Sequence, residues 1–471
     1  MHMSIELPKI IDTRFRSALQ RLSNAGRIES VSGTVSHEYE VASLLKKRDG
    51  SKALLFPDVQ GFEMPVFGNF LCSQANCEVA FGTDFRGIRQ LVGRAIANPL
   101  EPRIKQTAPW QENVYTKDLD IGKLLPVLRH AESDPGRFIT AGVVVFRDPE
   151  TGIYNASYHR LQLLGANKTA LKMDYGRHLR LAYERAATRG EDLPISVCIG
   201  TDLSVLYTAA TMGSQMPENA DELKVAGGLI GEGLPVCKGI TQDILIPAET
   251  EIVLEGLLRH NVFAHEGPFG EFIGYMSEEG DAPIFDVTSV AHRNNAVYYA
   301  INGFGRETVM LRKYVLEASL LRVLQAATPI VDDVDMTAGG LHRFHAVLSL
   351  NKTTEKHDGL QYNAMMASFG ALKDLDMVIA VDNDIDIHDP HDVEYALATR
   401  MEASRDLVVI PGARGHEYVR IGKDGIRAKL AIDATVPFNQ KARFTRVKFM
   451  PSNIDESRLE ADATQHISWL E

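Results

Sequence analysis

Between residues 140 and 302 the sequence alternates short apolar segments with turn residues, and this pattern limits the fold more than any other feature. The segments 141–146 and 154–161, joined by a turn at 148–152, predict a β-hairpin. The other segments for which a strand is expected are 196–200, 243–247, 251–256, 286–290 and 296–301. Many short strands in succession favour a β-barrel or a β-sandwich with inserted helices.

The residues before this region predict a small α/β unit. Helices are expected at 13–25 and at 87–98, each with apolar residues on one face. Short strands are expected at 53–56 and 66–68. This unit carries no sequence pattern that points to chemistry.

The residues after this region predict a long helix and a second α/β unit. Residues 311–327 place apolar side chains on one stripe and end before Pro329, which is typical of a connecting helix. A βαβ run follows, with a strand at 377–381, a helix from about 390 to 402 and a strand at 407–410. This pattern favours parallel pairing of the two strands.

Composition excludes several classes of protein. The formal net charge of −12 argues against a nucleic-acid-binding surface, which would be basic. No apolar run reaches the roughly 18 residues of a membrane span. Four cysteines are too few for a disulfide framework, and the spacing of Cys72 and Cys77 is not that of most zinc pairs. We therefore expect a reduced, cytoplasmic protein.

The most informative motif is a turn flanked by two carboxylates, Glu266 and Glu271. Between them lies Gly267-Pro268-Phe269-Gly270, which cannot be helical because proline fixes its φ and glycine reaches φ values closed to other residues. Such a turn can bring both acids to one cavity wall, where unlike environments would keep one ionised and the other a proton donor. For an arbitrary pair at this spacing, two solvated glutamates are the commoner outcome.

Two other motifs have simpler interpretations. The aspartate-rich segment 382–389 is not a calcium loop, because Ile387 stands where glycine is needed and Val393 where glutamate is needed. We interpret it as a strand end with aspartates in a turn, with Asp389 capping the following helix and Pro390 in its first turn. The glycine-rich segment 227–233 has the wrong spacing for a dinucleotide site and predicts a flexible turn.

The segment Glu266–Glu271, together with Ile252-Val253-Leu254-Glu255-Gly256 before it, resembles the signature of the UbiD family of reversible decarboxylases. The resemblance covers about residues 10–440 and implies an α/β fold with a flavin-binding split β-barrel. The expected divisions are an N-terminal α/β cap (1–110), the split-barrel cofactor domain (111–306), a linker helix (307–328), a C-terminal α/β oligomerisation domain (329–450) and a tail (451–471).

The same resemblance implies the catalytic residues. Arg160 is expected to pair with Glu266 and to steer the substrate carboxylate, while Glu271 delivers the proton that replaces CO₂. The family uses prenylated FMN, which acts as an electron sink. A flavin prenyltransferase would supply this cofactor.

The resemblance also implies a metal site made by Asn155, His178 and Glu222. In the family these positions hold a divalent ion, here Mn²⁺ or Mg²⁺, against the flavin phosphate, and K⁺ is a further candidate ion. Asn155 and Arg160 differ by an odd number, so a regular strand would send them to opposite faces. We therefore expect a bulge, or a cofactor held at the edge of the strand.

The residues expected to contact the flavin fall on the family's cofactor contacts. They are Thr140, Ser157, Tyr158, His159, Arg160, Arg177, His178, Met212, Gly213, Ser214, Gln215, Glu222 and Lys429. For the substrate, Phe272 is a candidate wall of a flat apolar slot. Phe304 and Arg306 lie in a glycine-rich loop, where Arg306 could bind a second carboxylate.

The function expected from the resemblance is reversible decarboxylation of a heteroaromatic acid, such as furandicarboxylate or indole-3-carboxylate, by a homodimer or hexamer. Three alternatives remain open. The substrate could be a phenolic, benzoic or cinnamate-like acid. The chain could be a plain FMN oxidoreductase, which would not need the Glu–Arg–Glu set, or a non-catalytic flavin-binding homologue, which would tolerate loss of Glu271.

Overall fold

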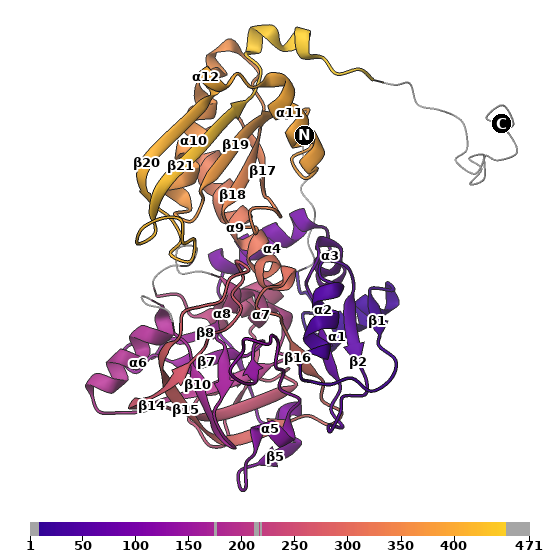
Figure 1. Cartoon of the computed structure of the whole chain (residues 1–471), viewed down its shortest axis with the longest axis vertical. Helices are drawn as coiled ribbons and strands as arrows, with labels where there is room; N and C mark the ends of the chain where they lie inside the picture. Colours follow the sequence, from indigo (N-terminus) through magenta and orange to yellow (C-terminus); the bar gives the residue numbers. More distant parts are fainter. Residues whose placement is uncertain (1–8, 174–176, 212–215, 217–218, 449–471) are drawn as a thin grey trace, which may run out of the picture.

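The computed structural model describes residues 9–173, 177–211, 216 and 219–448, so the expected tail lies outside the described residues. Figure 1 shows a C-terminal unit above the rest of the molecule, with one helix, α9 (Arg306–Ala327), between them. The fold is mixed α/β, and among the described residues the strands form four sheets. None of the helices in these ranges is long and apolar enough to cross a membrane.

The N-terminal unit has a four-stranded sheet in the order β1-β2-β3-β16. Its elements are α1 (Phe15–Asn24), β1 (Ile28–Ser30), α2 (Glu40–Lys47), β2 (Ala53–Phe56), β3 (Val66–Gly68), α3 (Gln74–Phe81) and α4 (Phe85–Ala97). The fourth strand, β16 (Tyr298–Ala300), pairs in parallel with β3. We had expected this segment among the barrel strands. Its side chains are all buried, and the free edge of β3 satisfies its backbone instead.

The middle unit is a curled, nine-stranded sheet that forms the expected half-barrel. The strand order is β6-β9-β10-β15-β14-β11-β7-β8, and β5 also pairs with β15. The strands are β5 (Asn113–Tyr115), β6 (Phe138–Ile139), β7 (Val143–Arg147), β8 (Tyr154–Tyr158), β9 (Leu161–Leu163), β10 (Lys168–Leu171), β11 (Leu193–Ile199), β14 (Ile252–Glu266) and β15 (Gly280–His292). The predicted hairpin is present as β7 and β8. Irregular register between β14 and β15 gives these long strands the bends that a curled sheet requires.

Helices and a small sheet complete this unit. They are α5 (Ile121–Leu124), α6 (His178–Thr188), α7 (Leu203–Ala210), α8 (Glu222–Ile230), and the sheet of β4 (Arg103–Lys105), β12 (Pro235–Lys238) and β13 (Leu245–Pro247). The prediction of a flexible turn at 227–233 is wrong for residues 227–230, which belong to α8. A Cβ at Gly228 would come within 2.5 Å of the Asn98 carbonyl, so glycine allows α8 to approach the end of α4. Gly231, with φ of 91°, then ends the helix.

Helix α9 joins two hydrophobic cores. Its first half, including Leu311 and Tyr314, packs in the core that the N-terminal and middle units share. Its second half, including Leu320 and Leu324, packs in the core of the C-terminal unit. The predicted connecting helix is therefore present, and it begins at Arg306, before the apolar stripe of 311–327 and next to the expected start of the linker at 307.

The C-terminal unit is a five-stranded sheet in the order β17-β18-β19-β21-β20. Its elements are β17 (Val331–Met336), β18 (His345–Leu350), α10 (Leu360–Ala371), β19 (Met377–Asp382), α11 (Pro390–Arg400), α12 (Ala403–Asp406), β20 (Leu407–Arg414) and β21 (Ile426–Ala434). The predicted parallel pairing of 377–381 with 407–410 is wrong. β20 lies at the edge, antiparallel to β21, and β21 is the parallel neighbour of β19. The C-terminal half of β21 is almost wholly buried, whereas β20 is half exposed, so burial places β21 inside the sheet.

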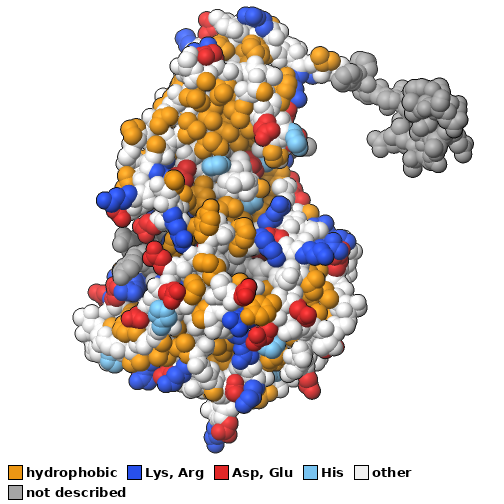
Figure 2. All heavy atoms as spheres, in the orientation of Figure 1, with side chains coloured by type: hydrophobic (Ala, Val, Ile, Leu, Met, Phe, Trp, Pro, Cys, Tyr) orange, Lys and Arg blue, Asp and Glu red, His pale blue; other side chains and the backbone are white. Residues whose placement is uncertain are grey.

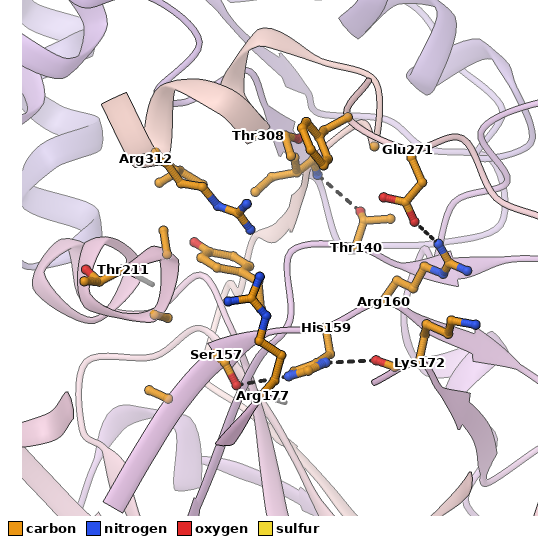
Figure 3. A pocket seen from close by; sticks show the side chains of 18 of the residues that line it. Thr140, Ser157, His159, Arg160, Lys172, Arg177, Thr211, Glu271, Thr308 and Arg312 are labelled. Atoms are coloured by element: carbon orange, nitrogen blue, oxygen red, sulfur yellow. Dashed lines mark hydrogen bonds and ion pairs between the residues drawn. The ribbon is translucent and has the colours of Figure 1, made fainter. Parts of the chain in front are cut away.

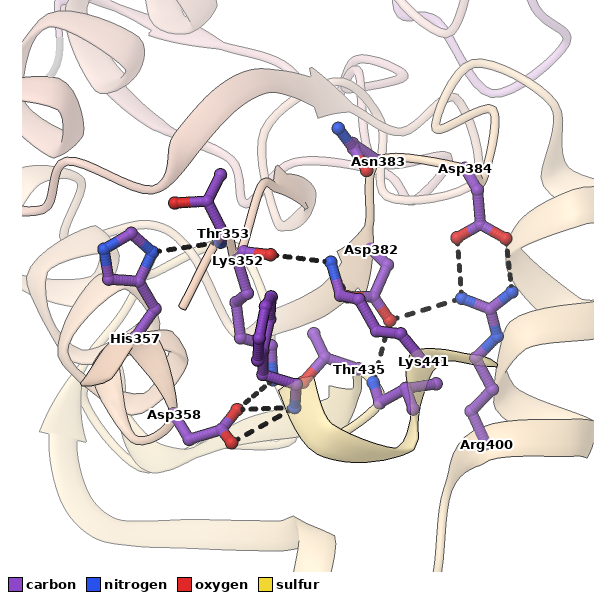
Figure 4. Close-up of polar contacts among 12 residues, drawn as sticks. Lys352, Thr353, His357, Asp358, Asp382, Asn383, Asp384, Arg400, Thr435 and Lys441 are labelled. Carbon is purple, nitrogen blue, oxygen red and sulfur yellow. Dashed lines mark hydrogen bonds and ion pairs between the residues drawn. The ribbon is translucent and has the colours of Figure 1, made fainter. Parts of the chain in front are cut away.

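The aspartate-rich segment has the structural role that we expected. Both carboxylate oxygens of Asp384 accept hydrogen bonds from Arg400, at 2.8 and 2.6 Å (Figure 4). Asp389 caps α11 by accepting a hydrogen bond from the backbone N of His391 at 3.0 Å. These aspartates therefore pair with a neighbouring arginine and a helix N-terminus, which satisfies them within the protein.

Candidate active site

A cavity of about 270 Å³ lies where the half-barrel, α9 and the C-terminal unit meet. Its walls come from β8, from the turn after Glu266 and from the first half of α9 (Figure 3). Two C-terminal loops, which carry Arg343, His416 and Tyr418, complete them. A wider cleft of about 1000 Å³ adjoins it. The residues that line both are Lys172, Arg177, Glu271, Arg343, His416 and Tyr418. The cleft therefore gives a ligand access to the inner cavity.

Arg160 reaches the cavity because the chain breaks between two strands. β8 ends at Tyr158 and β9 begins at Leu161, so His159 and Arg160 lie in an irregular connection. The regular alternation of side chains stops at this break. Asn155 and Arg160 are an odd number of residues apart, but because of this break both side chains can line the same cavity.

The structure brings Arg160, Glu266 and Glu271 together. Arg160 donates to both carboxylate oxygens of Glu266, from Nε at 2.7 Å and from Nη2 at 2.8 Å. Its Nη1 contacts Glu271 on the other side (Figure 3). The Glu266 side chain is fully buried, whereas Glu271 is 19% exposed. The two carboxylates therefore differ in environment, as the sequence suggested, with one enclosed and one at the cavity wall.

Electrostatics keep Arg160 charged in this position. Burial alone would lower the pKa of Arg160, but the hydrogen bond and the negative charge of Glu266, with a further contribution from Glu271, outweigh it and raise the pKa. A bidentate pair between a guanidinium and a carboxylate also fixes the orientation of both groups. Arg160 is thus a permanent, oriented cation.

Asn155, His178 and Glu222 converge at the other end of the cavity. Asn155 Nδ2 lies 2.6 Å from His178 Nδ1 and 2.7 Å from Glu222 Oε1. They come from β8 and from the first residues of α6 and α8, so two helix N-termini meet here. Burial raises the pKa of Glu222 to about 7, against the opposing effect of His178. Hydrogen bonding and charge from Glu222 in turn raise the pKa of His178.

This cluster suits a divalent cation. Glu222 Oε2 is buried and has no hydrogen-bond partner among the described residues. An orphaned carboxylate oxygen of this kind is costly to bury unless a cation neutralises it. A half-turn of the Asn155 amide would present its oxygen where Nδ2 now lies, giving a hard oxygen ligand beside an imidazole and a carboxylate.

Most of the expected flavin contacts line this cavity. They are Thr140, Ser157, Tyr158, His159, Arg160, Arg177, His178 and Glu222. The ring of His159 is held at both nitrogens, 3.0 Å from Ser157 Oγ and 2.9 Å from the Lys172 carbonyl (Figure 3). Four others, Met212, Gly213, Ser214 and Gln215, lie outside the described residues.

Lys429 is not placed at the cavity. Its ammonium group is buried on β21, where it donates to the carbonyls of Lys373, at 2.8 Å, and of Leu375. It also lies 3.3 Å from Asp376 Oδ1. The expected contact of Lys429 with the flavin phosphate is therefore not supported, because neighbouring carbonyls and a carboxylate already occupy its donors.

Of the three residues expected to bind substrate, one lines the cavity. Phe272 does so and packs against Phe344, with ring centroids 6.2 Å apart. Phe304 is 46% exposed and lies under the ammonium group of Lys46. Arg306 lies against Gly50, where a Cβ would come within 2.6 Å of its side chain. Phe304 and Arg306 are not among the lining residues, because their loop turns toward the N-terminal unit.

Sequence reasoning missed the residues that the C-terminal unit adds to the cavity. Arg343, His416 and Tyr418 line it, and Arg343 is bound to Asp374 at 2.8 Å. Burial and the nearby charge of Arg343 lower the pKa of His416 to about 3, so its ring is neutral. A local signal for Arg343 was the pair Gly339-Gly340 before it, which indicates a turn.

Three family models match the chain in order. They are described as the N-terminal, Rift-related and C-terminal domains of 3-octaprenyl-4-hydroxybenzoate carboxy-lyase, and they match residues 19–95, 103–305 and 309–434. An anhydromevalonate phosphate decarboxylase of Methanothermobacter thermautotrophicus is 33% identical over 88% of this chain and 96% of that protein. A gallate decarboxylase of Lactiplantibacillus plantarum is 30% identical over 84% and 86%.

Solved structures agree. The UbiD-class enzyme HmfF from Pelotomaculum thermopropionicum, in complex with FMN, superposes with a TM-score of 0.88 at 34% identity, covering 92% of this chain and 97% of that one. The apo 3,4-dihydroxybenzoic acid decarboxylase of Enterobacter cloacae gives a TM-score of 0.88 at 26% identity, covering 98% and 100%. With the Glu–Arg–Glu set in its half-barrel, the chain belongs to the UbiD family of carboxy-lyases.

Proposed function

We propose that this protein catalyses the reversible, non-oxidative decarboxylation of a heteroaromatic or aromatic carboxylic acid with prenylated FMN. The observation that carries the proposal is Arg160, held by a buried Glu266 and facing Glu271 at the cavity wall. HmfF, the structural relative described above, has been solved with FMN and, in an evolved dimeric form, with prenylated FMN.

Each member of the set has a separate role in the proposal. Arg160 attracts the substrate carboxylate and orients it, because its charge and direction are fixed by Glu266. Prenylated FMN, when bound, supplies the electron sink that makes loss of CO₂ accessible. Glu271 then donates the proton that replaces CO₂, since it is the carboxyl group exposed to the cavity.

The cofactor phosphate would be held at the other end of the cavity. Asn155, His178 and Glu222 would bind Mn²⁺ or Mg²⁺, for which the orphaned Glu222 Oε2 provides a ligand. Arg177 precedes α6 and lines the same wall, so its charge would add to the attraction for a phosphate.

The cavity walls favour a planar substrate. Four Phe and Tyr side chains line them, Tyr158, Phe269, Phe272 and Tyr418, and aromatic rings pack well against an aromatic acid. A second candidate has a specific observation behind it. Arg177, Arg312 and Arg343 also line the cavity, and their charges suit a second anionic group on the substrate. In addition, two relatives named as anhydromevalonate phosphate decarboxylases are each 33% identical to this chain, against 34% for HmfF. A phosphorylated unsaturated acid is therefore the competing substrate.

We also propose that the protein forms a homodimer through its C-terminal unit. The edge strand β20 exposes Leu407 and Val409, and the neighbouring β21 exposes Ile426. Figure 2 shows hydrophobic side chains gathered over this sheet. An unpaired, apolar edge is a surface that soluble proteins normally cover, and a second copy would cover it symmetrically.

The test uses protein produced with and without a flavin prenyltransferase. Turnover is measured on furan-2,5-dicarboxylate, indole-3-carboxylate, gallate, cinnamate and a phosphorylated unsaturated acid. We expect activity on the planar acids only in the prenylated sample, and Glu271→Gln to lower turnover by about 10²–10⁴-fold while the flavin stays bound. Equal turnover with ordinary FMN would reject the cofactor assignment, and activity confined to the phosphorylated acid would reject the aromatic substrate.

A further inference from the structure

The loop that carries Glu271 joins β14 to β15 and is closed at its base by one side chain. Phe269 N donates to Ser277 Oγ at 3.1 Å, and Ser277 N donates to the Phe269 carbonyl at 2.7 Å. Nearer the tip, Glu271 N donates to the Tyr275 carbonyl at 2.9 Å. The loop is therefore a small hairpin whose two arms are joined at Phe269 and Ser277, with Glu271 inside it.

Ser277 also connects this hairpin to Arg160. Arg160 Nη2 donates to Ser277 Oγ at 3.0 Å, and the same nitrogen donates to Glu266 Oε2 at 2.8 Å. Glu266 is the last residue of β14, so its bidentate pair anchors the guanidinium on the sheet, and the loop reaches the guanidinium through Glu271 and Ser277. The hydroxyl oxygen of Ser277 thus accepts both from the fixed Arg160 cation and from the backbone of the loop that carries Glu271.

Other contacts hold the two ends of the loop but do not reach the guanidinium. Gln162 Oε1 accepts from Gly267 N at 2.9 Å, which fixes where the loop leaves β14. Arg420, from the C-terminal unit, donates to the Met276 carbonyl. Ser277 differs from both because it contacts Arg160 and the backbone of Phe269 at once.

We infer that Ser277 is a positioning residue, which sets the place of Glu271 relative to Arg160 by tying the loop to the guanidinium. The inference rests on the proposed role of Glu271 as proton donor. A donor acts only within hydrogen-bond reach of its target, and a displacement of about 1 Å can cost roughly a hundredfold in rate. Loss of the tie would therefore lower turnover while the Arg160–Glu266 pair remains.

The experiment compares Ser277→Ala, Ser277→Thr and a matched control, Ser289→Ala. Ser289 is a buried serine on β15 whose Oγ lies 3.5 Å from Glu255, and it does not line the cavity. Hydrogen exchange of a peptide covering residues 266–280 is followed in the cofactor-free proteins. Values of kcat and KM are measured in the cofactor-loaded proteins on the acid that the native enzyme converts best.

In Ser277→Ala we expect faster exchange in that peptide and a kcat lowered by on the order of tenfold or more, with KM changed by less than about threefold. Ser277→Thr, which keeps the hydroxyl, restores both, and Ser289→Ala changes neither. Native exchange and native kcat in Ser277→Ala, beside an inactive Glu271→Gln, would overturn this inference alone. A fully active Glu271→Gln would overturn the proposed proton donor and the inference with it.

Discussion

His388 lies in a buried ionic cluster where the N-terminal unit, α9 and the C-terminal unit meet, and its protonation should contribute to stability. Its Nδ1 is 3.0 Å from Asp335 Oδ1, and its Nε2 is 3.8 Å from Asp333 Oδ2. Arg89 of α4 binds Asp333 at 2.8 Å, and Lys313 of α9 binds Asp335 at 2.6 Å. The cluster therefore joins all three parts of the molecule through alternating charges.

The magnitude follows from the pKa of His388. Burial alone would lower it, but the close contact with Asp333, the hydrogen bond to Asp335 and the charges of both aspartates outweigh burial and raise the pKa from 6.5 to about 9. At 1.36 kcal/mol per pKa unit this corresponds to about 3.4 kcal/mol. The side chain is 24% exposed, so solvent screening reduces the expected contribution to about 1–2 kcal/mol.

The sign follows from the raised pKa. Because the folded protein binds the proton more tightly than the unfolded chain, the stabilisation is fully present below pH 6.5 and is lost as the pH rises through about 9. Urea unfolding is measured by circular dichroism at about pH 6 and about pH 9.5, for the native protein and for His388→Gln. We expect the native protein to lose about 1–2 kcal/mol more than the variant between these two conditions. Other titrating groups are common to both proteins and cancel. An equal loss in the two proteins would refute this reasoning.

Three further predictions address the site and the assembly. Glu222→Ala should keep its circular dichroism spectrum but lose metal and flavin together in native mass spectra, and a variant that keeps either would contradict the ligand assignment. Val409→Asp should convert a dimer to a monomer, as measured by light scattering, and leave kcat unchanged. The reason is that a charge replaces an exposed apolar side chain on β20. An unchanged molecular mass would place the interface elsewhere. Arg343→Leu should raise KM by about tenfold, whereas Arg306→Leu should change KM by less than about twofold. The reason is that Arg343 lines the cavity and Arg306 does not. A larger effect of Arg306→Leu on KM would restore Arg306 as the substrate residue.

Local sequence was sufficient where a short segment determines its own conformation. The segment Gly267-Pro268-Phe269-Gly270 excludes a helix, so Glu266 and Glu271 had to flank a turn. The apolar stripe of 311–327 predicted α9, because its spacing matches the helical repeat. The family resemblance then linked Arg160 to those two glutamates and joined Asn155, His178 and Glu222, although they are far apart in the chain. The structure brings each of these sets together.

The predictions that failed depended on which distant segments meet. The order of β20 and β21 is decided by which strand buries more apolar surface, and β16 pairs with β3 across more than two hundred residues of chain. Arg306 was proposed from its glycine-rich loop and Lys429 from the family resemblance, and neither lines the cavity. Arg306 lies against Gly50, and Lys429 donates to the carbonyls of Lys373 and Leu375.

The sequence by itself thus determined the main helices and strands, because these depend on residue type and local spacing. Its motifs also indicated the family, and the resemblance to that family, not local spacing, proposed Glu271 as the acid and Asn155, His178 and Glu222 as the metal-binding residues. Only the tertiary structure decided that the C-terminal unit contributes Arg343, His416 and Tyr418 to the cavity, and that Ser277 contacts both Arg160 and the loop of Glu271. Packing between separate units depends on the whole set of buried surfaces, and no local pattern encodes it.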